Sequence, residues 1–167
     1  MAESIYKNIR KDLGLTREIV YDLSLKHDNQ MQPERLERIE NGKFNITPDE
    51  VLLLSKIYKK PELCNHYCSN ECPIGAKYVP EIKMKDLSQI VLETLSSLNS
   101  LVNKKERLIE ITVDGVIEEN EIKDFIYIQN ELEKISITVE TLQLWAEQML
   151  ADHIINNEAY NKIKNEK

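Results

Sequence analysis

The chain has 167 residues, of which 41% are apolar and 31% charged, and its formal net charge is −7. These values exclude a disordered protein and favour one large or two small soluble domains with a core of their own. No apolar leader opens the chain and its longest uninterrupted apolar stretch, Val51–Leu54, cannot span a membrane, so we expect a cytoplasmic protein.

The charge is distributed unevenly along the chain. Residues 1–60 hold 11 Lys/Arg and 10 Asp/Glu, a balance of +1, whereas residues 61–167 hold 11 and 19, a balance of −8. A near-neutral first part joined to an acidic second part fits a protein in which only the first part meets phosphate groups. A balance of +1 is not a basic patch, so this support is weak.

Apolar residues recur at spacings of three and four, and strand-like alternation is nearly absent, which predicts an all-α fold. The first predicted helix ends at Gly14, and Thr16 is expected to cap the second. The third opens at Pro33 and is followed by Gly42 as its C′ residue. The residues expected to face inward on these helices are Ile5, Ile9, Leu13, Ile19, Val20, Leu23, Leu36 and Ile39.

The stretch "TPDE" at 47–50 is the clearest helix start in the sequence. Thr47 is expected to cap the fourth helix, with Pro48 at its first position and Glu50 completing a capping box. This helix carries Val51, Leu54 and Ile57 inward and is expected to end near residue 60.

The N-terminal helices resemble a known family. The segment "LGLTREIVYDLS…ERLERIENGKFNITPDEVLLLSKIYKKPEL" resembles the Xre/Cro-type helix-turn-helix domain of phage-repressor-like (lambda-repressor-like) regulators over about residues 4–62. The remainder, from "CNHYCSNECPIGAKYVPEIKMKDLSQIVLETL" onward, resembles the C-terminal part of a Firmicutes group of helix-turn-helix regulators. The resemblance implies a DNA-binding bundle at the N-terminus, and brings little function for the rest.

The resemblance also implies which residues meet double-stranded DNA. These are Thr16, Arg17, Gln32, Glu34, Arg35, Arg38 and Lys43. Gln and Arg suit base edges and phosphates, but two glutamates facing DNA are unfavourable unless each accepts from a cytosine amino group. The stretch "LSLKHDNQMQPER" is also about five residues longer than is usual for the family. The alternative is a helix-turn-helix fold kept as a protein-binding module.

All three cysteines lie in "ELCNHYCSNECPIG" at 62–75, where Cys64, Cys68 and Cys72 are four residues apart and His66 lies between the first two. An odd count in a reducing compartment argues against a disulfide framework. On a short helix opened by Pro61, Cys64 and Cys68 would share a face, and Cys72 could fold back to complete a three-thiolate corner.

Three thiolates suit Zn²⁺ or an iron–sulfur cluster, although this spacing is not a common one for either. His66 would point elsewhere unless the turn is distorted, so the fourth ligand could instead be His27, His153, a residue of a second subunit or a small molecule. Reactive thiols without a metal, and buried small side chains, remain the alternatives.

The C-terminal half is predicted to be helical after an extended linker, "YVPEIKMKD". One long helix runs from Asp86 to about Ile109, a second covers 122–135, and a third covers "TVETLQLWAEQML" at 138–150. They form a helical hairpin or a three-helix bundle. Their apolar stripes form its core or, where exposed, a homodimer contact.

A calcium loop can be overlaid on "EITVDGVIEENE" at 110–121, with Asp114, Gly115 and Glu121 at matching positions. Glu110 and Thr112 replace the preferred acids at its first two ligand positions, so we expect a helical corner without calcium. The sequence contains no glycine-rich phosphate loop, nucleophile elbow or HExxH pair, so we do not expect an enzyme.

These observations predict three parts: a helix-turn-helix domain at 1–60, a cysteine-bearing bridge at 61–80, and a helical oligomerisation or effector domain at 81–167. The expected function is a sequence-specific DNA-binding transcriptional regulator, acting as a homodimer and responding to a metal or to oxidation at the cysteines. The alternative is a protein-interaction adaptor with a structural zinc site, whose acidic C-terminal domain docks a protein partner.

Overall fold

The computed structural model of the chain describes residues 4–27, 29–113 and 115–166. Over these residues it contains ten α-helices, one π-helical turn and no strand, which confirms the predicted all-α class. The backbone forms two compact units, Met1–Glu81 with Glu147–Lys167, and Ile82–Ala146. In the described part, no helix has both the length and the apolar character that crossing a membrane requires.

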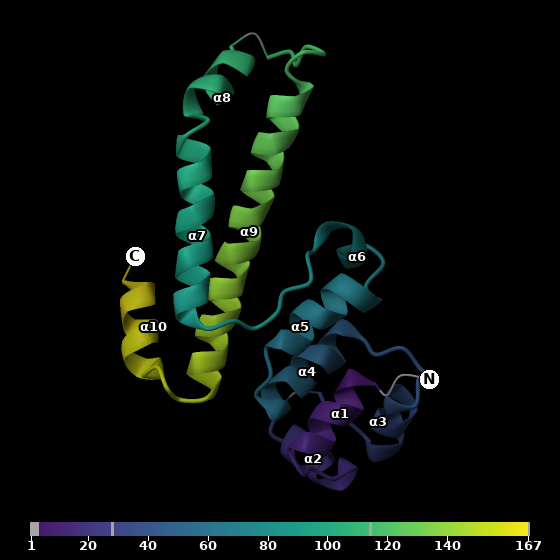
Figure 1. Cartoon of the computed structure of the whole chain (residues 1–167). Helices are drawn as coiled ribbons and strands as arrows, with labels where there is room; N and C mark the ends of the chain where they lie inside the picture. Colours follow the sequence, from purple (N-terminus) through teal and green to yellow (C-terminus); the bar gives the residue numbers. More distant parts are fainter. Residues whose placement is uncertain (1–3, 28, 114, 167) are drawn as a thin grey trace. The chain divides into compact units, whose positions relative to one another are not determined.

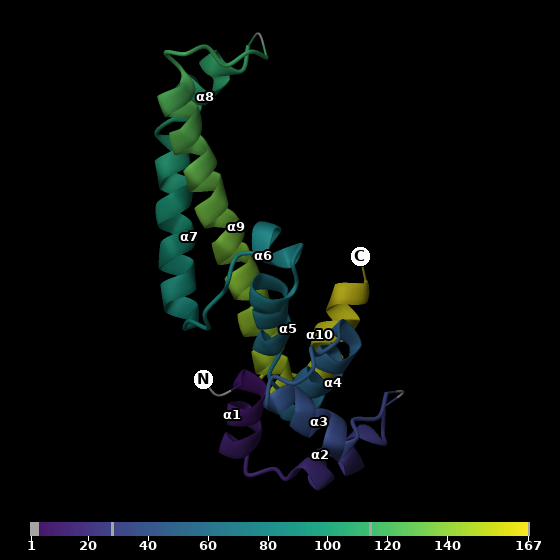
Figure 2. The same ribbon diagram turned by 90° about the vertical axis from the view of Figure 1, so that its right-hand side faces the viewer.

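The first unit gathers short helices around one core, as Figures 1 and 2 show for α1 to α4. Its elements are α1 (Ile5–Asp12), α2 (Arg17–Ser24), α3 (Pro33–Glu40), α4 (Pro48–Tyr58), α5 (Glu62–His66), a π-helical turn (Tyr67–Glu71), α6 (Gly75–Tyr78), the last turn of α9 and α10 (Asn157–Asn165). The helix predicted to open at Pro61 is present as α5, whereas α6 was not predicted.

The predicted helix ends are confirmed. The Thr16 hydroxyl accepts a hydrogen bond from the Ile19 amide at 3.2 Å. At α4, the Glu50 amide donates to the Thr47 hydroxyl at 3.4 Å and the Thr47 amide donates to the Glu50 carboxylate at 2.8 Å. Gly42 has a φ of 66°, in the left-handed region that glycine adopts without strain. Local sequence therefore fixes where these helices begin and end.

The core of the first unit is apolar and includes residues from α5 as well as from the first four helices. Its buried members are Tyr6, Val20, Met31, Leu36, Ile39, Ile46, Val51, Leu53, Leu54, Tyr58 and Leu63. The inward face of α1 differs from the prediction, because Leu13 is exposed and Tyr6 and Arg10 are its most buried residues. The same holds on α2, where Val20 is buried but Ile19 is exposed.

The long segment between α2 and α3 is a loop. Among its described residues no further helical turn is present, and Met31 is buried in the core. The Met31 amide donates to the Ser24 hydroxyl at 3.0 Å, which ties the end of the loop to the end of α2. The connection between α2 and α3 is therefore a loop that is anchored to the core through Met31.

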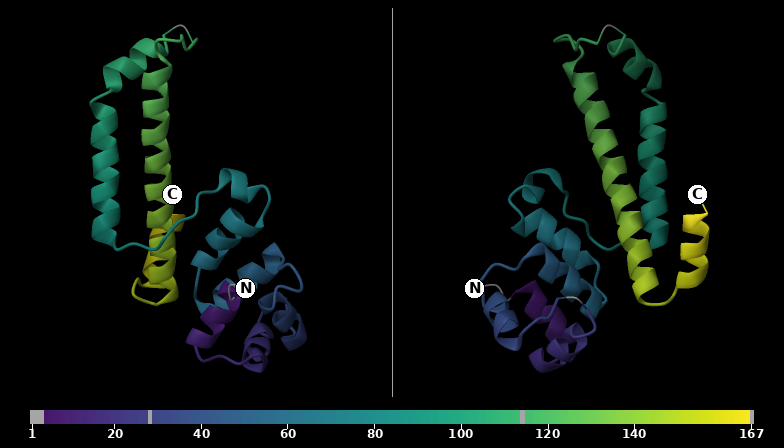
Figure 3. Two further views of the ribbon diagram at one scale, coloured as in Figure 1. Left: turned by 45° about the vertical axis from the view of Figure 1, so that its right-hand side comes forward. Right: turned by 180° about the vertical axis from the view of Figure 1, so that it is seen from behind.

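The second unit is a helical hairpin. Its elements are α7 (Leu87–Val102), α8 (Lys105–Ile111) and the greater part of α9 (Ile122–Ala151). The Asp86 side chain caps α7 by accepting from the Gln89 amide at 2.9 Å. Within this unit, α7 and α9 run side by side in opposite directions, as Figures 1 and 3 agree. Arg107 on α8 binds Asp124 on α9 at 2.7 Å and joins the far ends of the hairpin.

All three helices expected in this half have other bounds. The helix predicted from Asp86 to Ile109 is interrupted at residues 103–104, so that α7 and α8 are separate. The two helices predicted at 122–135 and 138–150 are one helix of 30 residues, α9. No Gly or Pro occurs between its ends, so the β-branched run at 135–139 lowers helix propensity without stopping the helix.

Candidate functional site

The outer face of α3 carries most of the residues predicted to meet DNA. Leu36 and Ile39 hold the helix against the core, and the residues between them turn outward. Gln32, Glu34, Glu37 and Arg38 are exposed on α3 or at its cap, and Lys43 is exposed just after its end. The structure therefore presents these side chains from one short, well-anchored helix, as a site on a rigid element requires.

Arg35 is also on α3 but is engaged within the chain. Its guanidinium donates to both oxygens of the Glu50 carboxylate, at 2.7 and 2.9 Å, and to the Asn45 carbonyl at 2.9 Å. Burial raises the pKa of Glu50, but the hydrogen bonds from Arg35 and Thr47 outweigh it and hold this pKa below its usual value. A bidentate pair of this kind fixes the side chain, so Arg35 orients the start of α4 instead of reaching outward.

An exposed aromatic residue, which was not among the predicted site residues, lies beside Arg35 and Arg38. Phe44 is 51% exposed, and the guanidinium carbons of Arg35 and Arg38 lie 5.5 Å from its ring centroid. An aromatic ring this close to two guanidinium groups is stabilised by cation–π attraction. The sequence signal was an aromatic residue in the otherwise polar stretch "NGKFN" directly after the predicted recognition helix.

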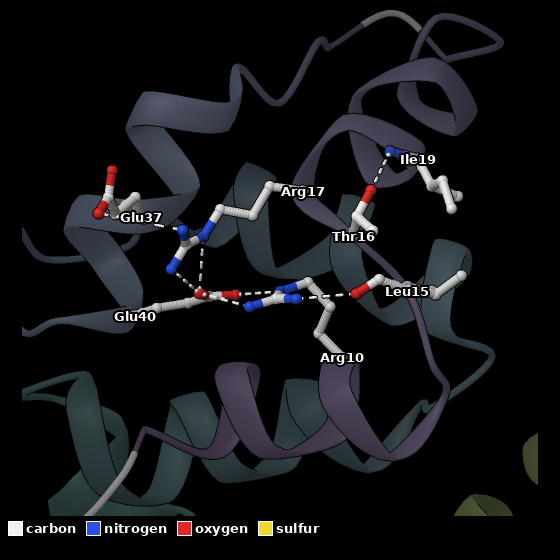
Figure 4. Close-up of polar contacts among 7 residues, drawn as sticks. All are labelled: Arg10, Leu15, Thr16, Arg17, Ile19, Glu37 and Glu40. Carbon is white, nitrogen blue, oxygen red and sulfur yellow. Dashed lines mark hydrogen bonds and ion pairs between the residues drawn. The ribbon is translucent and has the colours of Figure 1, made fainter.

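Glu40 is the centre of a buried charge network that joins α1, α2 and α3 (Figure 4). Its carboxylate accepts from Arg10 Nε at 2.5 Å and from a second Arg10 nitrogen at 2.9 Å. Arg17 donates to the same carboxylate at 3.0 Å, and Arg10 also donates to the Leu15 carbonyl at 2.8 Å. The Glu40 side chain has no exposed surface.

This network changes the role of one predicted DNA contact. Arg17 is held by Glu40 and lies 3.9 Å from the Glu37 carboxylate, so part of its charge is neutralised inside the chain. Thr16 precedes it and uses its hydroxyl to cap α2 (Figure 4). The arrangement fixes α3 against α1 and α2 through charge-assisted hydrogen bonds. Arg10 and Glu40 had not been singled out in the sequence.

The cysteine segment begins on α5 and changes helical type. Cys64 is partly buried against the core of the first unit. The π-helical turn at Tyr67–Glu71 is closed by a hydrogen bond from the Cys72 amide to the Tyr67 carbonyl at 2.9 Å. Burial and, secondarily, the neighbouring Cys72 and Cys64 thiols raise the pKa of Cys68. The π-helical turn departs from the regular α-helix on which the metal site was predicted. All three cysteines are free thiols.

The residues around the thiols form hydrogen bonds and polar contacts with one another. The Gly75 amide donates to the Cys72 sulfur at 3.5 Å. His66 faces Glu71 at 3.7 Å, and the same carboxylate accepts from the Tyr6 hydroxyl at 2.7 Å. Within the described ranges, no three His, Cys, Asp or Glu side chains are placed together so that they could hold a metal ion. The zinc or iron–sulfur centre predicted at Cys64, Cys68, Cys72 and His66 therefore stays a prediction without geometric support.

The overlaid calcium loop contains side chains with other partners. The Thr112 hydroxyl donates to the Leu108 carbonyl at 2.9 Å, and Glu110 pairs with Arg107 at 3.1 Å. The Glu121 carboxylate accepts a hydrogen bond from the Glu118 amide at 3.1 Å. Asp114 lies outside the described residues.

Comparison with known proteins adds no assignment: no family model, no curated protein and no solved structure matches the chain.

Proposed function

We propose that the first unit binds double-stranded DNA and that the chain is a sequence-specific transcriptional regulator working as a homodimer. In this proposal α2 and α3 form the helix-turn-helix and α3 is its recognition helix. The observation that carries it is the outer face of α3, which is exposed along its length while Leu36, Ile39 and the Glu40 network hold the helix in place. A fixed helix with exposed polar side chains is what groove recognition requires.

We propose fewer DNA contacts than the resemblance implies. Arg38 and Lys43 are exposed and suit phosphate groups, and Gln32 suits a base edge. Arg17 and Arg35 are engaged with Glu40 and Glu50, so we assign to them the positioning of α3 and α4.

A selection from random duplex DNA, followed by fluorescence anisotropy at several salt concentrations, tests the proposal. We expect an enriched sequence whose binding weakens steeply as salt rises. Replacing both Arg38 and Lys43 by Ala should reduce the slope of log K against log salt by about 2, since each phosphate contact contributes about 0.9. Lys105→Ala, an exposed lysine of the hairpin unit, is the control and should change nothing. Binding without an enriched sequence, or equal effects of all variants, contradicts the proposal.

A protein-interaction adaptor is the second candidate, because Glu34 and Glu37 are exposed on the same helix and Arg35 is neutralised by Glu50. This leaves the outer face of α3 with two carboxylates against the single guanidinium of Arg38. Absence of salt-dependent DNA binding by the intact dimer would favour the adaptor.

Metal or redox control through the cysteines is part of the regulator proposal. Elemental analysis and a visible spectrum of protein purified without oxygen, with Cys68→Ser beside it, test this part. Stoichiometric iron with a sulfur-to-iron chromophore supports a redox or iron response, and colourless protein with zinc supports a structural site. If the wild-type protein contains no metal and behaves like Cys68→Ser, both the iron response and the structural zinc site are excluded.

A further inference from the structure

Among the described residues of the hairpin unit, many more large apolar side chains are exposed than apolar side chains are buried. Within the described residues of 82–146, four apolar side chains are buried and seventeen large ones are exposed, whereas the longer first unit buries eleven and exposes nine. A helix with an apolar stripe is stable only when the stripe packs against another element. The exposed apolar side chains of the hairpin therefore need a further structural element to pack against.

The polar sides of α7 and α9 lie together on one side of the hairpin, and their apolar sides lie together on the other. A pocket between the two helices is lined mainly by polar residues, among them Ser96, Ser97 and Ser100 on α7 and Glu131, Lys134 and Thr138 on α9, together with Ile137. On each helix the exposed apolar stripe is rotated about 70–80° from the line of contact, in the sense opposite to the pocket residues. Because the helices are antiparallel, equal senses of rotation bring both stripes to the same side of the hairpin.

We call this side the apolar face. Its exposed members are Leu87, Val91, Leu95, Leu98 and Val102 on α7, and Phe125, Leu132, Val139 and Leu142 on α9. On α9 they belong to a heptad repeat that continues for four heptads, with a and d positions filled by Phe125, Ile128, Leu132, Ile135, Val139, Leu142, Ala146 and Met149. A sustained 3–4 repeat of this kind is the pattern of helices that pack in coiled coils and bundles.

The border of the apolar face indicates what covers it. Along α9 the outer border is formed by Gln129, Ser136 and Gln143, and along α7 by Ser88 and Asn99, all exposed and uncharged. Residues 82–146 carry 7 Lys/Arg and 12 Asp/Glu, so a partner chosen by charge would be basic and would meet acidic residues at this border. An uncharged border instead lets two acidic copies approach without like-charge repulsion.

We propose that the apolar face is the dimer interface of this chain. A second copy lays its own apolar face against it, and the two hairpins form a four-helix bundle with the polar pockets on the outside. This face would be the contact surface of the homodimer proposed above. The inference rests on the hairpin residues alone and does not depend on DNA binding by the first unit.

Sedimentation velocity of the full chain under reducing conditions, over a range of concentrations, tests the proposal. We expect the wild-type protein to be a dimer. The dimer dissociation constant of the Leu132→Glu variant should be at least 100-fold larger than that of the wild type. Ile126→Glu is the matched control: Ile126 is 48% exposed and Leu132 52%, but Ile126 lies about 120° round α9 from Leu132, off the heptad seam. Monomeric wild-type protein, or equal weakening by both variants, overturns the proposal.

A second measurement does not depend on a destabilised variant. A benzoylphenylalanine placed at Phe125, 40% exposed in the apolar face, should give a covalent dimer on illumination, with the cross-link mapped to α7 or α9 of the other copy. The same group at Tyr127, 39% exposed and on another side of α9, should give none. No dimer from position 125, or equal yields from both, overturns the proposal, and neither outcome depends on DNA binding.

Discussion

Replacing Glu40 by Gln should cost the first unit a large part of its stability. The Glu40 carboxylate is the shared acceptor of Arg10 and Arg17, at distances of 2.5 to 3.0 Å, and its side chain has no contact with water. Gln keeps the shape but removes the negative charge, so the Arg10 guanidinium, 10% exposed, is left buried without its counter-ion.

The magnitude follows from the burial of both partners. Removing one member of a buried, hydrogen-bonded ion pair costs about 3–5 kcal/mol, because the remaining charge stays desolvated. Arg10 keeps its hydrogen bond to the Leu15 carbonyl, which places the expected loss near the lower limit, at about 3 kcal/mol. With a urea dependence of about 1.5 kcal/mol/M, the midpoint of the first unit should fall by about 2 M.

Urea titration followed by two signals measures this change. Circular dichroism reports on all helices, whereas fluorescence of Trp145, the single tryptophan, reports on the hairpin unit. We expect a shifted circular-dichroism transition and a smaller shift by fluorescence. The double variant Arg10→Met/Glu40→Leu should recover much of the loss, because the most deeply buried charges are removed and Arg17, 27% exposed, keeps Glu37 nearby. A loss below 1 kcal/mol for Glu40→Gln would refute the buried-charge argument.

Three further outcomes are expected. Gly75→Ala should destabilise the cysteine segment by about 1–3 kcal/mol in thermal unfolding, because a Cβ at this position would lie 2.0 Å from the Cys68 carbonyl oxygen. Because the folded-state pKa of Glu50 is depressed, its bond to Arg35 stabilises the fold above the unfolded pKa and is lost as pH falls through the folded one. Acid titration of Glu50→Gln should thus show about 1 kcal/mol less stability than wild type at pH 7 and a smaller decline below pH 4.5. Alkylation of Cys68 by iodoacetamide, followed by peptide mass spectrometry, should be slower than alkylation of an exposed cysteine in a short peptide, because the raised pKa lowers the fraction of reactive thiolate.

Helix ends in the first unit were predictable because they depend on residues close in sequence. Thr47 and Glu50 close a capping box within four residues, and Gly42 takes a conformation that only its lack of a Cβ makes easy. The bounds of α9 were not predictable in the same way. The β-branched run at 135–139 looks like a break by propensity, yet packing along a 30-residue helix outweighs propensities of a few tenths of a kcal/mol per residue.

The candidate site was only partly predictable. Exposure of Arg38 follows from its position on α3 away from Leu36 and Ile39, and exposure of Gln32 and Lys43 follows from their places at the N-cap of α3 and after its end. The engagement of Arg35 by Glu50 does not, because the two residues are brought together by the turn between α3 and α4. The same applies to the cysteine segment, where a four-residue spacing predicts a shared helical face but the chain forms a π-helical turn.

The two units stabilise themselves by different means, and this difference bears on both proposals. The first unit combines an apolar core with a buried charge network, so its stability should not depend on protein concentration. A hairpin that is completed only by a second copy gains stability by mass action, and its unfolding midpoint should rise with concentration. The units are joined twice, by residues 79–86, which contain no helix, and by α9, which is continuous across residues 146 and 147. If the first unit binds DNA as proposed, a dimer formed through the hairpins makes binding of the second half-site intramolecular, which would raise DNA affinity without any new contact to DNA.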